Sequence, residues 1–252
     1  MHTKTAYFRF YAELNDFLPP ERKQTEFAYQ FTGKPAVKDA IEALGVPHTE
    51  VDLILINGTS VGFGHHIRHE DHISVYPVFE LLDIGEVNHL REKPLRETQF
   101  ILDVHLGKLA RLLRMLGFDT LYRNDYEDSE IIETAVRENR IILTRDIGIL
   151  KNSAVTHGYW LRSTESDEQI IEVLDHFDLY SQIIPFHRCL TCNGLIERVE
   201  KEDINEKLPP QTAEFFNEFY QCQECEKIYW KGSHYHKMES KIKKILEQAR
   251  SS

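Results

Sequence analysis

Residues 100–146 decide the fold, and they read FILDVHLGKLARLLRMLGFDTLYRNDYEDSEIIETAVRENRIILTRD. Short apolar runs alternate in this stretch with longer segments whose leucines and isoleucines recur at helical spacing. Repeated strand–helix units of this kind predict a mostly parallel, right-handed sheet covered by helices, which is the α/β class. The expected strands are 100–102, 120–122, 141–144 and 159–161, and the expected helices are 105–116, 129–138 and 166–177.

Acidic residues follow each of the first three expected strands. Asp103 comes directly after the first strand, Asp125, Glu127 and Asp128 lie in the loop after the second, and Asp146 follows the third by one residue. Ligands of open α/β sheets bind beyond the carboxyl ends of the strands, so we expect these acids to share one rim. Mg²⁺ and Mn²⁺ prefer such hard oxygen ligands. Bound there, one or two ions could activate a water molecule for phosphodiester hydrolysis.

Each of these acids also has a structural alternative. Asp128 is placed to cap a helix that starts at Ser129. Asp125 can be a turn residue, and Asp146 can begin a helical turn. The spacing of the acids leaves the metal site and these local roles open.

The same stretch resembles the Mut7-C RNase domain family, a branch of the PIN-like nucleases, over roughly residues 99–240. The resemblance rests on the Asp103 strand, the LGKLARLLRMLGFDT segment, the Asp125/Asp128 loop and the LTRD element that ends at Asp146. It implies a PIN-like parallel sheet with helices, and Asp103, Asp128 and Asp146 as catalytic acids that bind Mg²⁺ or Mn²⁺. Asp125 is a further catalytic candidate. Members of the family often carry an N-terminal ubiquitin-like domain and a C-terminal zinc ribbon.

PIN-like domains often use a fourth acid after the fourth strand. In this chain Glu165 and Asp167 are the nearby options, and the sequence does not choose between them.

Basic residues near the expected rim are candidates for substrate binding. Arg145 directly precedes Asp146, and Lys108, Arg111 and Arg114 recur every three residues along the first helix. They could contact the phosphates of a bound strand. A solvated helix face is the alternative for the three helical residues, and it explains them more readily.

All four cysteines fall in two CxxC pairs, Cys189 with Cys192 and Cys222 with Cys225. Each pair can offer two thiolates to one tetrahedral Zn²⁺. The 29 residues between the pairs exceed the usual spacing of about 15–20, and we expect the insert, which contains Pro209-Pro210, to loop out. Four thiolate ligands leave no open position for water, so the predicted zinc is structural.

The segment 227–237, KIYWKGSHYHK, mixes aromatic with basic residues. Such a composition suits a surface that stacks bases and contacts phosphates. The alternative is that Tyr229 and Trp230 pack the ribbon against the nuclease domain. The final segment, 237–249, predicts a docking helix with an apolar side and a lysine-rich side.

The N-terminal region reads as a small α+β unit. Strands are expected at 5–10, 25–31, 53–56 and 72–77, with a helix from Val37 and a tight turn at Asn57-Gly58. Over roughly residues 4–80 this order resembles the ubiquitin-like β-grasp fold, particularly its sulfur-carrier branch. Those carriers end in Gly-Gly, whereas this chain runs on into another domain, so we expect an accessory module that makes a self-contact or binds a protein partner.

The expected domains are therefore 1–82 (ubiquitin-like), 83–98 (linker), 99–184 (PIN-like nuclease) and 185–252 (zinc ribbon and C-terminal helix). The net charge of −11 argues against a protein that coats nucleic acid non-specifically. No 18-residue apolar run and no signal-peptide core occur, so we expect a cytoplasmic protein without a membrane segment.

The expected function is metal-dependent hydrolysis of RNA of the endoribonuclease type, with structural Zn²⁺ and catalytic Mg²⁺ or Mn²⁺. DNA stays open as a substrate because no residue pattern identifies a reader of the 2′-hydroxyl. The rival interpretation is a non-catalytic RNA-binding adaptor that uses the ribbon and the basic tail.

Overall fold

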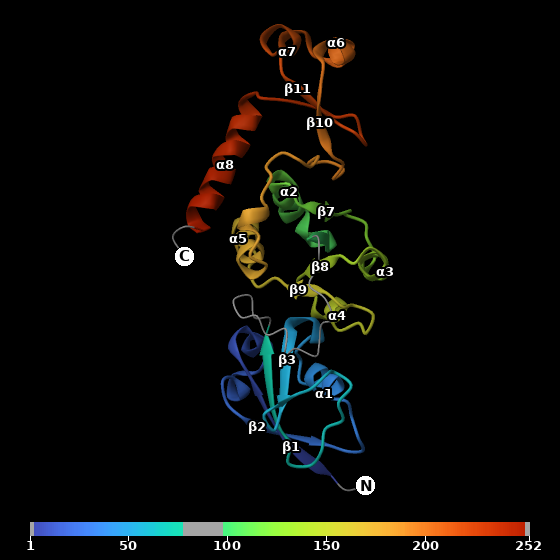
Figure 1. Cartoon of the computed structure of the whole chain (residues 1–252), viewed down its shortest axis with the longest axis vertical. Coiled ribbons are helices and arrows are strands. Elements are labelled where there is room, and N and C mark those ends of the chain that lie inside the picture. The colour runs from blue at the N-terminus through green and yellow to red at the C-terminus, as the bar shows by residue number, and fades with distance from the viewer. Residues whose placement is uncertain (1–2, 78–97, 250–252) are drawn as a thin grey trace. The chain divides into compact units, whose positions relative to one another are not determined.

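The computed structural model describes residues 3–77 and 98–249 (Figure 1). The predicted linker at 83–98 lies outside the described residues, apart from Thr98.

The chain forms two compact units. The first combines Met1–Glu97 with Thr144–Trp160, and the second combines Thr98–Leu143 with Leu161–Ser252. A segment of the α/β region therefore belongs to the same compact unit as the N-terminal domain.

The N-terminal part of the first unit is a mixed five-stranded sheet with one α-helix. Its elements are β1 (Lys4–Phe10), η1 (Ala12–Phe17), η2 (Pro20–Arg22), β2 (Phe27–Phe31), α1 (Val37–Ala43), η3 (His48–Glu50), β3 (Val51–Ile56), β4 (Thr59–Ser60) and β5 (His72–Pro77), where η marks a 3₁₀ helix. The strand order is β2-β1-β5-β3-β4, with β1 parallel to β5 and the other pairs antiparallel. This is the β-grasp arrangement, and it confirms the expected ubiquitin-like fold.

The core of this domain follows from the alternation of apolar residues along its strands. Phe8, Phe10 and Ile54 are buried, and α1 adds the buried Ile41 from the helical face that covers the sheet. The predicted tight turn joins β3 to β4. Both of its central residues have positive φ, 51° at Asn57 and 83° at Gly58, as a two-residue hairpin loop with the twist of its strands requires.

The second segment of the first unit contains α4 (Ile147–Leu150) and β9 (Gly158–Trp160). The predicted fourth strand is thus present, one residue earlier than expected. Within this unit β9 packs against η3, and α4 packs against β9.

The second unit begins with the predicted strand–helix repeat. Its elements are β6 (Gln99–Leu102), η4 (Val104–Leu106), α2 (Gly107–Leu116), β7 (Asp119–Leu121), α3 (Asp128–Glu138), β8 (Ile141–Thr144), α5 (Ser166–His176) and η5 (Tyr180–Gln182). The order β7-β6-β8 puts the first strand in the middle, and both of its pairings are parallel. Helix α2 packs against α5 and β7, and α3 packs against β6. The expected α/β fold is confirmed, and α2 ends at Gly117, whose φ is 100°.

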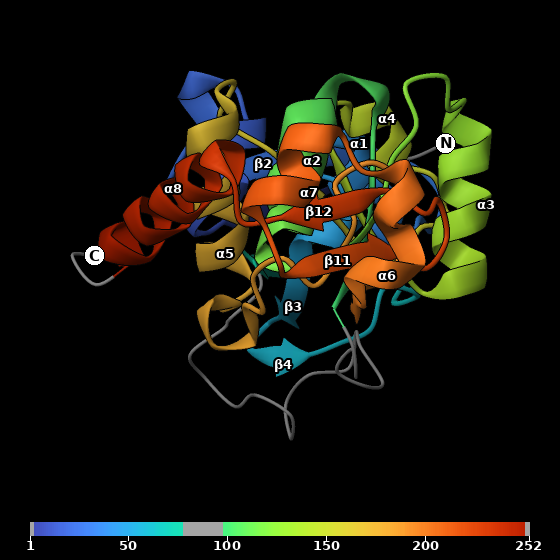
Figure 2. The same cartoon turned by 90° about the horizontal axis from the view of Figure 1, so that it is seen from above.

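The C-terminal part of the second unit is a small antiparallel sheet with an inserted helical loop and a long final helix. Its elements are β10 (Ile196–Val199), α6 (Lys201–Ile204), η6 (Asn205–Lys207), α7 (Pro210–Phe215), β11 (Phe219–Cys222), β12 (Ile228–Trp230) and α8 (Ser233–Ala249). The strand order is β10-β11-β12. The insert between the cysteine pairs forms α6 and α7 beside this sheet (Figure 2), and Ile204, Leu208 and Phe219 are buried in its core.

A polar network joins the parallel sheet to the cysteine-rich region. The carboxylate of Asp119 in β7 accepts hydrogen bonds from Arg140 at 2.6 Å and from the Asn193 amide at 2.9 Å, and Arg188 lies 3.2 Å from its second oxygen. Burial alone would raise the pKa of Asp119, but the bonds from Arg140 and Asn193 outweigh it and hold the pKa below its usual value.

We expect the substitution Asp119→Ala to lower the free energy of unfolding of the second unit by about 3 kcal/mol, because it leaves two partly buried guanidinium groups without their common partner. The pKa of this carboxyl is lower in the folded than in the unfolded state. Its stabilising effect is therefore present above about pH 4 and is lost as the pH falls through the lower, folded pKa. Denaturant unfolding at several pH values measures both effects.

The matched control is Glu138→Ala, which also removes a carboxylate bonded to Arg140. Glu138 is more exposed, so we expect a cost below about 1 kcal/mol. Equal costs for the two variants would contradict a special role for Asp119.

Candidate metal centre and acidic strand ends

The four cysteines converge on one point. Their sulfur atoms all lie within 4.8 Å of one another, and Cys189 Sγ is 3.6 Å from Cys225 Sγ while Cys192 Sγ is 3.3 Å from Cys222 Sγ. None of the four forms a disulfide. A tetrahedral zinc ion with Zn–S bonds of about 2.3 Å separates its thiolates by about 3.8 Å, so the four residues fit this ion.

The turn that carries the first cysteine pair, Cys189 and Cys192, is called the first knuckle here. It depends on a close approach of backbone to sulfur. Asn193 follows the first pair with φ at 75°, and a Cβ atom at Gly194 would lie 2.9 Å from Cys222 Sγ and 2.5 Å from Glu224 Cγ. Glycine is therefore needed at this position. The Asn193 side chain also accepts a hydrogen bond from the Thr120 amide at 2.8 Å, which fixes the knuckle to β7.

The environment of the thiols favours one thiolate. Burial alone would raise the pKa of Cys189, but hydrogen bonds from Tyr229 and from the backbone of Thr191 and Cys192 lower it to about 6. Burial, together with the neighbouring sulfur atoms, raises the pKa of Cys192. Four thiolates this close together require a cation between them, which is the charge pattern of a structural zinc site.

The aromatic segment after the second pair has mixed roles. Tyr229 Oη lies 3.0 Å from Cys189 Sγ, and Trp230 packs against Phe216 within the ribbon, with 6.5 Å between ring centroids. Both aromatic residues thus pack in the ribbon itself. They also line a cavity of about 350 Å³ together with Tyr235 and Arg188.

This aromatic cavity lies between the ribbon and the start of α8. Phe186 and Tyr235 pack against each other in its wall, with ring centroids 4.6 Å apart. Arg188 Nε is buried and has no hydrogen-bond partner among the described residues. Planar rings beside Lys231 form a surface on which a flat ring can stack next to a positive charge.

Asp103 lies at the carboxyl end of β6, the strand between β7 and β8. Its backbone N–H donates to the Leu143 carbonyl of β8 at 3.2 Å, and its own carbonyl accepts from Leu106 at 3.0 Å. The residue is 7% exposed. Tyr122, which follows β7, donates a hydrogen bond from its hydroxyl to the Val104 carbonyl at 2.9 Å, so the loops after the two strands are tied together beside Asp103.

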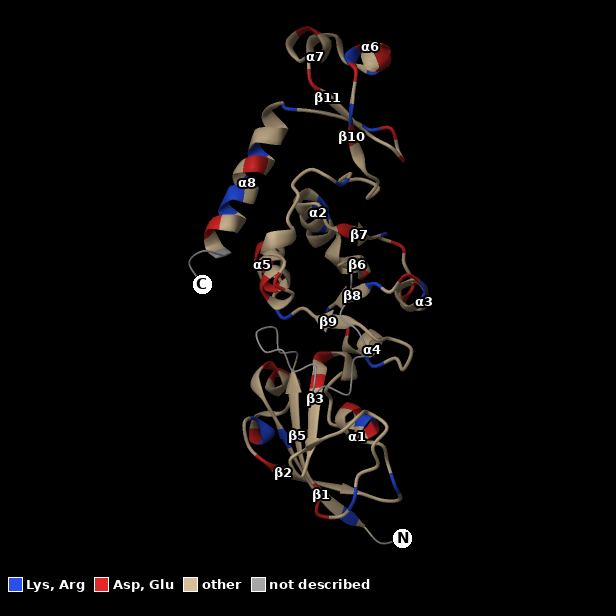
Figure 3. Ribbon diagram, viewed as in Figure 1, with Lys and Arg blue, Asp and Glu red and all other residues tan. Residues whose placement is uncertain are grey.

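Asp125 lies in the loop after β7 and Asp128 is the first residue of α3, where the ribbon in Figure 3 carries the red of acidic residues. Asp125 is exposed and pairs with Arg123 at 2.9 Å. The N-cap of α3 is Glu127, which forms a capping box with Glu130. The alternative role of Asp128 as a cap is therefore wrong, and its exposed carboxylate has no hydrogen-bond partner among the described residues.

Asp146 follows β8 and is the N-cap of α4. Its Oδ1 accepts a hydrogen bond from the Gly148 amide at 2.7 Å, and its own N–H donates to Thr144 Oγ1 at 2.8 Å. The helical-turn role considered for Asp146 is present, and one carboxylate oxygen remains outside this bond. Asp103, Asp125 and Asp128 belong to the second unit and Asp146 to the first, so the binding of one ion by Asp103, Asp128 and Asp146 stays a prediction.

The basic residues of α2 separate into two classes. Lys108 and Arg111 are exposed, as is Arg145 beside Asp146. Arg114 is only 5% exposed and donates from Nη1 to the Thr191 carbonyl at 3.1 Å and from Nε to the Thr120 carbonyl at 2.9 Å. Both predicted roles, exposure on a solvated helix face and contact with a phosphate, are therefore wrong for Arg114. Its guanidinium group is buried and donates hydrogen bonds to backbone carbonyls of β7 and of the first cysteine pair.

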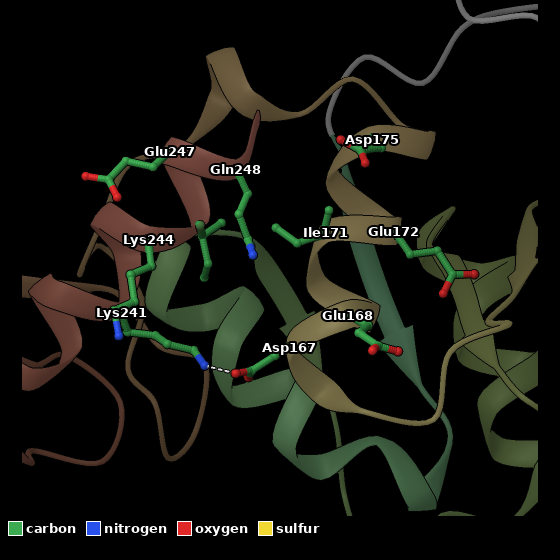
Figure 4. Close-up of a pocket in the computed structure, with 10 residues that line it drawn as sticks. Asp167, Glu168, Ile171, Glu172, Asp175, Lys241, Lys244, Glu247 and Gln248 are labelled. Atoms are coloured by element: carbon green, nitrogen blue, oxygen red, sulfur yellow. Dashed lines mark hydrogen bonds and ion pairs between the residues drawn. The ribbon is translucent and has the colours of Figure 1, made fainter. Parts of the chain in front are cut away.

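A wide groove of about 850 Å³ lies between α5 and α8, as Figure 4 shows. Glu165 and Asp167, the two options for a fourth acid, lie in or near this groove. Glu165 is the N-cap residue of α5, and Asp167 forms an ion pair with Lys241 of α8 (Figure 4). The ion pair with Lys241 gives Asp167 a role in docking α8. Within the described residues, the four cysteines are the one group of three or more such side chains close enough to share an ion.

Sequence reasoning missed the contributions of Arg188 and Asn193. Arg188 and Asn193 directly flank the first cysteine pair, and this position was the available signal. No helix within the two described ranges is long and apolar enough to cross a bilayer.

We expect purified protein to contain a single zinc ion per chain and Cys222→Ser protein to lose it, because three thiolates bind zinc more weakly than four. Elemental analysis measures the zinc. Substitution by Co²⁺ gives a second readout, since tetrahedral thiolate ligation produces a strong charge-transfer absorption. Zinc at the full level in Cys222→Ser protein, or none in the wild type, would show that the cysteines do not form this site.

Comparison with known families finds two matches. The Mut7-C RNAse domain matches residues 98–242, more than half of the chain, and the Mut7-C ubiquitin domain matches residues 3–83. No curated protein and no solved structure matches the chain. The first match covers the parallel sheet and the cysteine cluster, and the second covers the β-grasp sheet, so the two regions that the sequence separates correspond to two known domains. The chain belongs to the Mut7-C RNAse domain family and carries the Mut7-C ubiquitin domain at its N-terminus.

Proposed function

We propose that this protein is a metal-dependent ribonuclease that hydrolyses RNA phosphodiester bonds with Asp103, Asp128 and Asp146. The observation that carries the proposal is the position of Asp103, at the carboxyl end of the middle strand in the region matched by the RNAse domain. Ligands of open α/β sheets bind at that end. Asp128 and Asp146 follow the two strands that flank β6, which supports their inclusion.

The carboxylates fit Mg²⁺ or Mn²⁺ by their chemistry, because both ions prefer hard oxygen ligands. When bound, such an ion supplies an activated water and stabilises the leaving oxygen. Asp103 and Asp128 would each offer a carboxylate to it, while Asp146 would offer the oxygen that is not bonded to Gly148. Asp125 is a further candidate, although its ion pair with Arg123 competes with that role.

Binding of the RNA strand is assigned to exposed cations and to the aromatic cavity. Arg145, Lys108 and Arg111 are exposed and can contact phosphates. The cavity beside the ribbon offers Trp230 and Tyr235 as faces for a base and Lys231 as a charge for its phosphate. Together they would hold a strand without reading its sequence.

The second candidate is an RNA-binding adaptor without catalysis. It is favoured by the local structural roles of two acids, the cap formed by Asp146 and the ion pair of Asp125. In this case the aromatic cavity and the zinc ribbon carry the function, and the acids after the strands only shape their loops.

We expect Asp103→Asn to lower the rate of cleavage of end-labelled RNA in Mn²⁺ or Mg²⁺ by about 10²–10³-fold, the usual loss when one preorganised electrostatic group is removed from an active site. The matched control is Glu168→Gln, which neutralises an exposed acid on α5. Cleavage by the wild type must also stop in a chelator that leaves the zinc in place. RNA binding without cleavage in the wild type, across several RNAs, would instead support the adaptor.

Tyr235→Ala is expected to weaken binding of single-stranded RNA by about 5- to 150-fold, which corresponds to about 1–3 kcal/mol for one stacked base. Fluorescence anisotropy with labelled RNA, in the absence of added Mg²⁺ or Mn²⁺, measures binding apart from cleavage. His234→Ala is the control, because His234 is an exposed neighbour on α8 that does not line the cavity. Equal affinities for wild type and Tyr235→Ala would remove the cavity from the binding surface.

A further inference from the structure

The 3₁₀ helix η3 of the ubiquitin-like domain carries polar side chains that are almost completely buried. His48 is 6% exposed, Thr49 2% and Glu50 3%. Polar and charged residues are rarely buried to this degree unless they have partners. Two of the three have partners more than 100 positions further along the chain.

His48 holds the loop between α4 and β9. Its Nε2 donates to the Val155 carbonyl at 2.7 Å, and its Nδ1 lies 2.6 Å from Oε1 of Glu42 in α1. Val155 itself is 1% exposed. The imidazole ring therefore connects the helix of the β-grasp domain to a single carbonyl of the loop.

Glu50 holds the end of β9. Its Oε1 accepts a hydrogen bond from the Trp160 backbone N–H at 2.6 Å. The indole ring of Trp160 packs against Phe17 of η1, with ring centroids 5.1 Å apart. The same indole donates from Nε1 to the Arg145 carbonyl at 3.2 Å. A chain of contacts therefore runs from the β-grasp domain through Trp160 to the residue that precedes Asp146.

These contacts connect two regions that belong to different domain families. Glu50 and His48 lie in the region matched by the ubiquitin domain, whereas Asp146, Val155 and Trp160 lie in the region matched by the RNAse domain. The segment Thr144–Trp160 accordingly belongs to the compact unit of the β-grasp domain. His48 holds the loop of this segment and Glu50 holds its end at Trp160. Trp160 in turn holds the beginning of the segment through the Arg145 carbonyl.

We propose that the ubiquitin-like domain is a positioning element of the nuclease site, in which His48, Glu50 and Trp160 fix the backbone that presents Asp146. The proposal rests on the proposed function. Metal ligands must be held within a fraction of an ångström of their working geometry by the residues around them. Asp146 caps a helix of only four residues, which is too short to fix its own position. The β-grasp domain supplies the support that this helix lacks.

The test compares the full-length, zinc-loaded wild type with Glu50→Ala and Trp160→Phe. Glu50→Ala removes the acceptor for the Trp160 amide, and Trp160→Phe removes the donor to the Arg145 carbonyl while it keeps an aromatic ring beside Phe17. The matched control is Glu26→Ala, which deletes a carboxylate of the same domain that is bonded only to His72 among the described residues. Hydrogen exchange of peptides from 144–160 and calorimetric Mn²⁺ affinity are the readouts.

We expect amide exchange in 144–160 to rise about tenfold or more in both variants, with exchange in β1 unchanged. Mn²⁺ affinity should fall about 10- to 100-fold, as is usual when a residue that supports a metal ligand is lost. RNA cleavage should fall with it, and Glu26→Ala should match the wild type in all three measurements. Unchanged exchange in β1 excludes general unfolding as the cause.

Two results would overturn the positioning role. One is unchanged exchange in 144–160, and the other is faster exchange with Mn²⁺ affinity equal to that of the wild type. Failure of the proposed function looks different, because wild-type protein would then bind no Mn²⁺, or would bind it equally well after Asp103→Asn and Asp146→Asn. That outcome would remove the metal site and its positioning together, even if the exchange data show that the domain holds the segment.

Discussion

The second unit depends on the hydrogen bonds and ion pairs that the carboxylate of Asp119 makes. Asp119 stands at the start of β7 and is bonded to Arg140, which precedes β8, and to Asn193 in the first zinc knuckle. One half-buried anion thus joins two strands of the parallel sheet to the cysteine-rich region. Arg114 reinforces the same junction from α2, because its guanidinium group donates to carbonyls of β7 and of the knuckle. The parallel sheet and the cysteine-rich region consequently lie in one compact unit.

The regions that meet at this junction differ in the side chains that they present. The parallel sheet presents acids after its strands, and the cysteine cluster stabilises a region with a small core of its own. Aromatic and basic side chains gather where the ribbon meets α8. The β-grasp domain bonds to the segment that carries Arg145 and Asp146, through Glu50 and Trp160. In this arrangement the cysteine cluster and the segment 144–160 are each held by residues from another part of the chain.

Much of the fold follows from local patterns. The helix over 105–116, the turn at Asn57-Gly58 and the two cysteine pairs could be predicted because periodicity, turn chemistry and ligand spacing are properties of neighbouring residues. Arg114 shows the limit of this reasoning. At the spacing of Lys108 and Arg111 it looks like a member of an exposed basic row, yet it is buried because the knuckle returns to α2 from more than 70 residues away. The helical period of a segment does not show which residues, distant in the sequence, pack against each of its faces.

By itself the sequence determined the α/β and β-grasp classes, the two cysteine pairs and the acids that follow the strands, since each is encoded within a short segment. Tertiary structure alone decided which polar residues are buried together. The partners of Asp119, the loop held by His48 and the bond between Glu50 and Trp160 join residues that are far apart in the chain. Burial makes such pairs specific, because an unpaired buried charge is costly, but the identity of each partner depends on how the elements pack and not on any local signal.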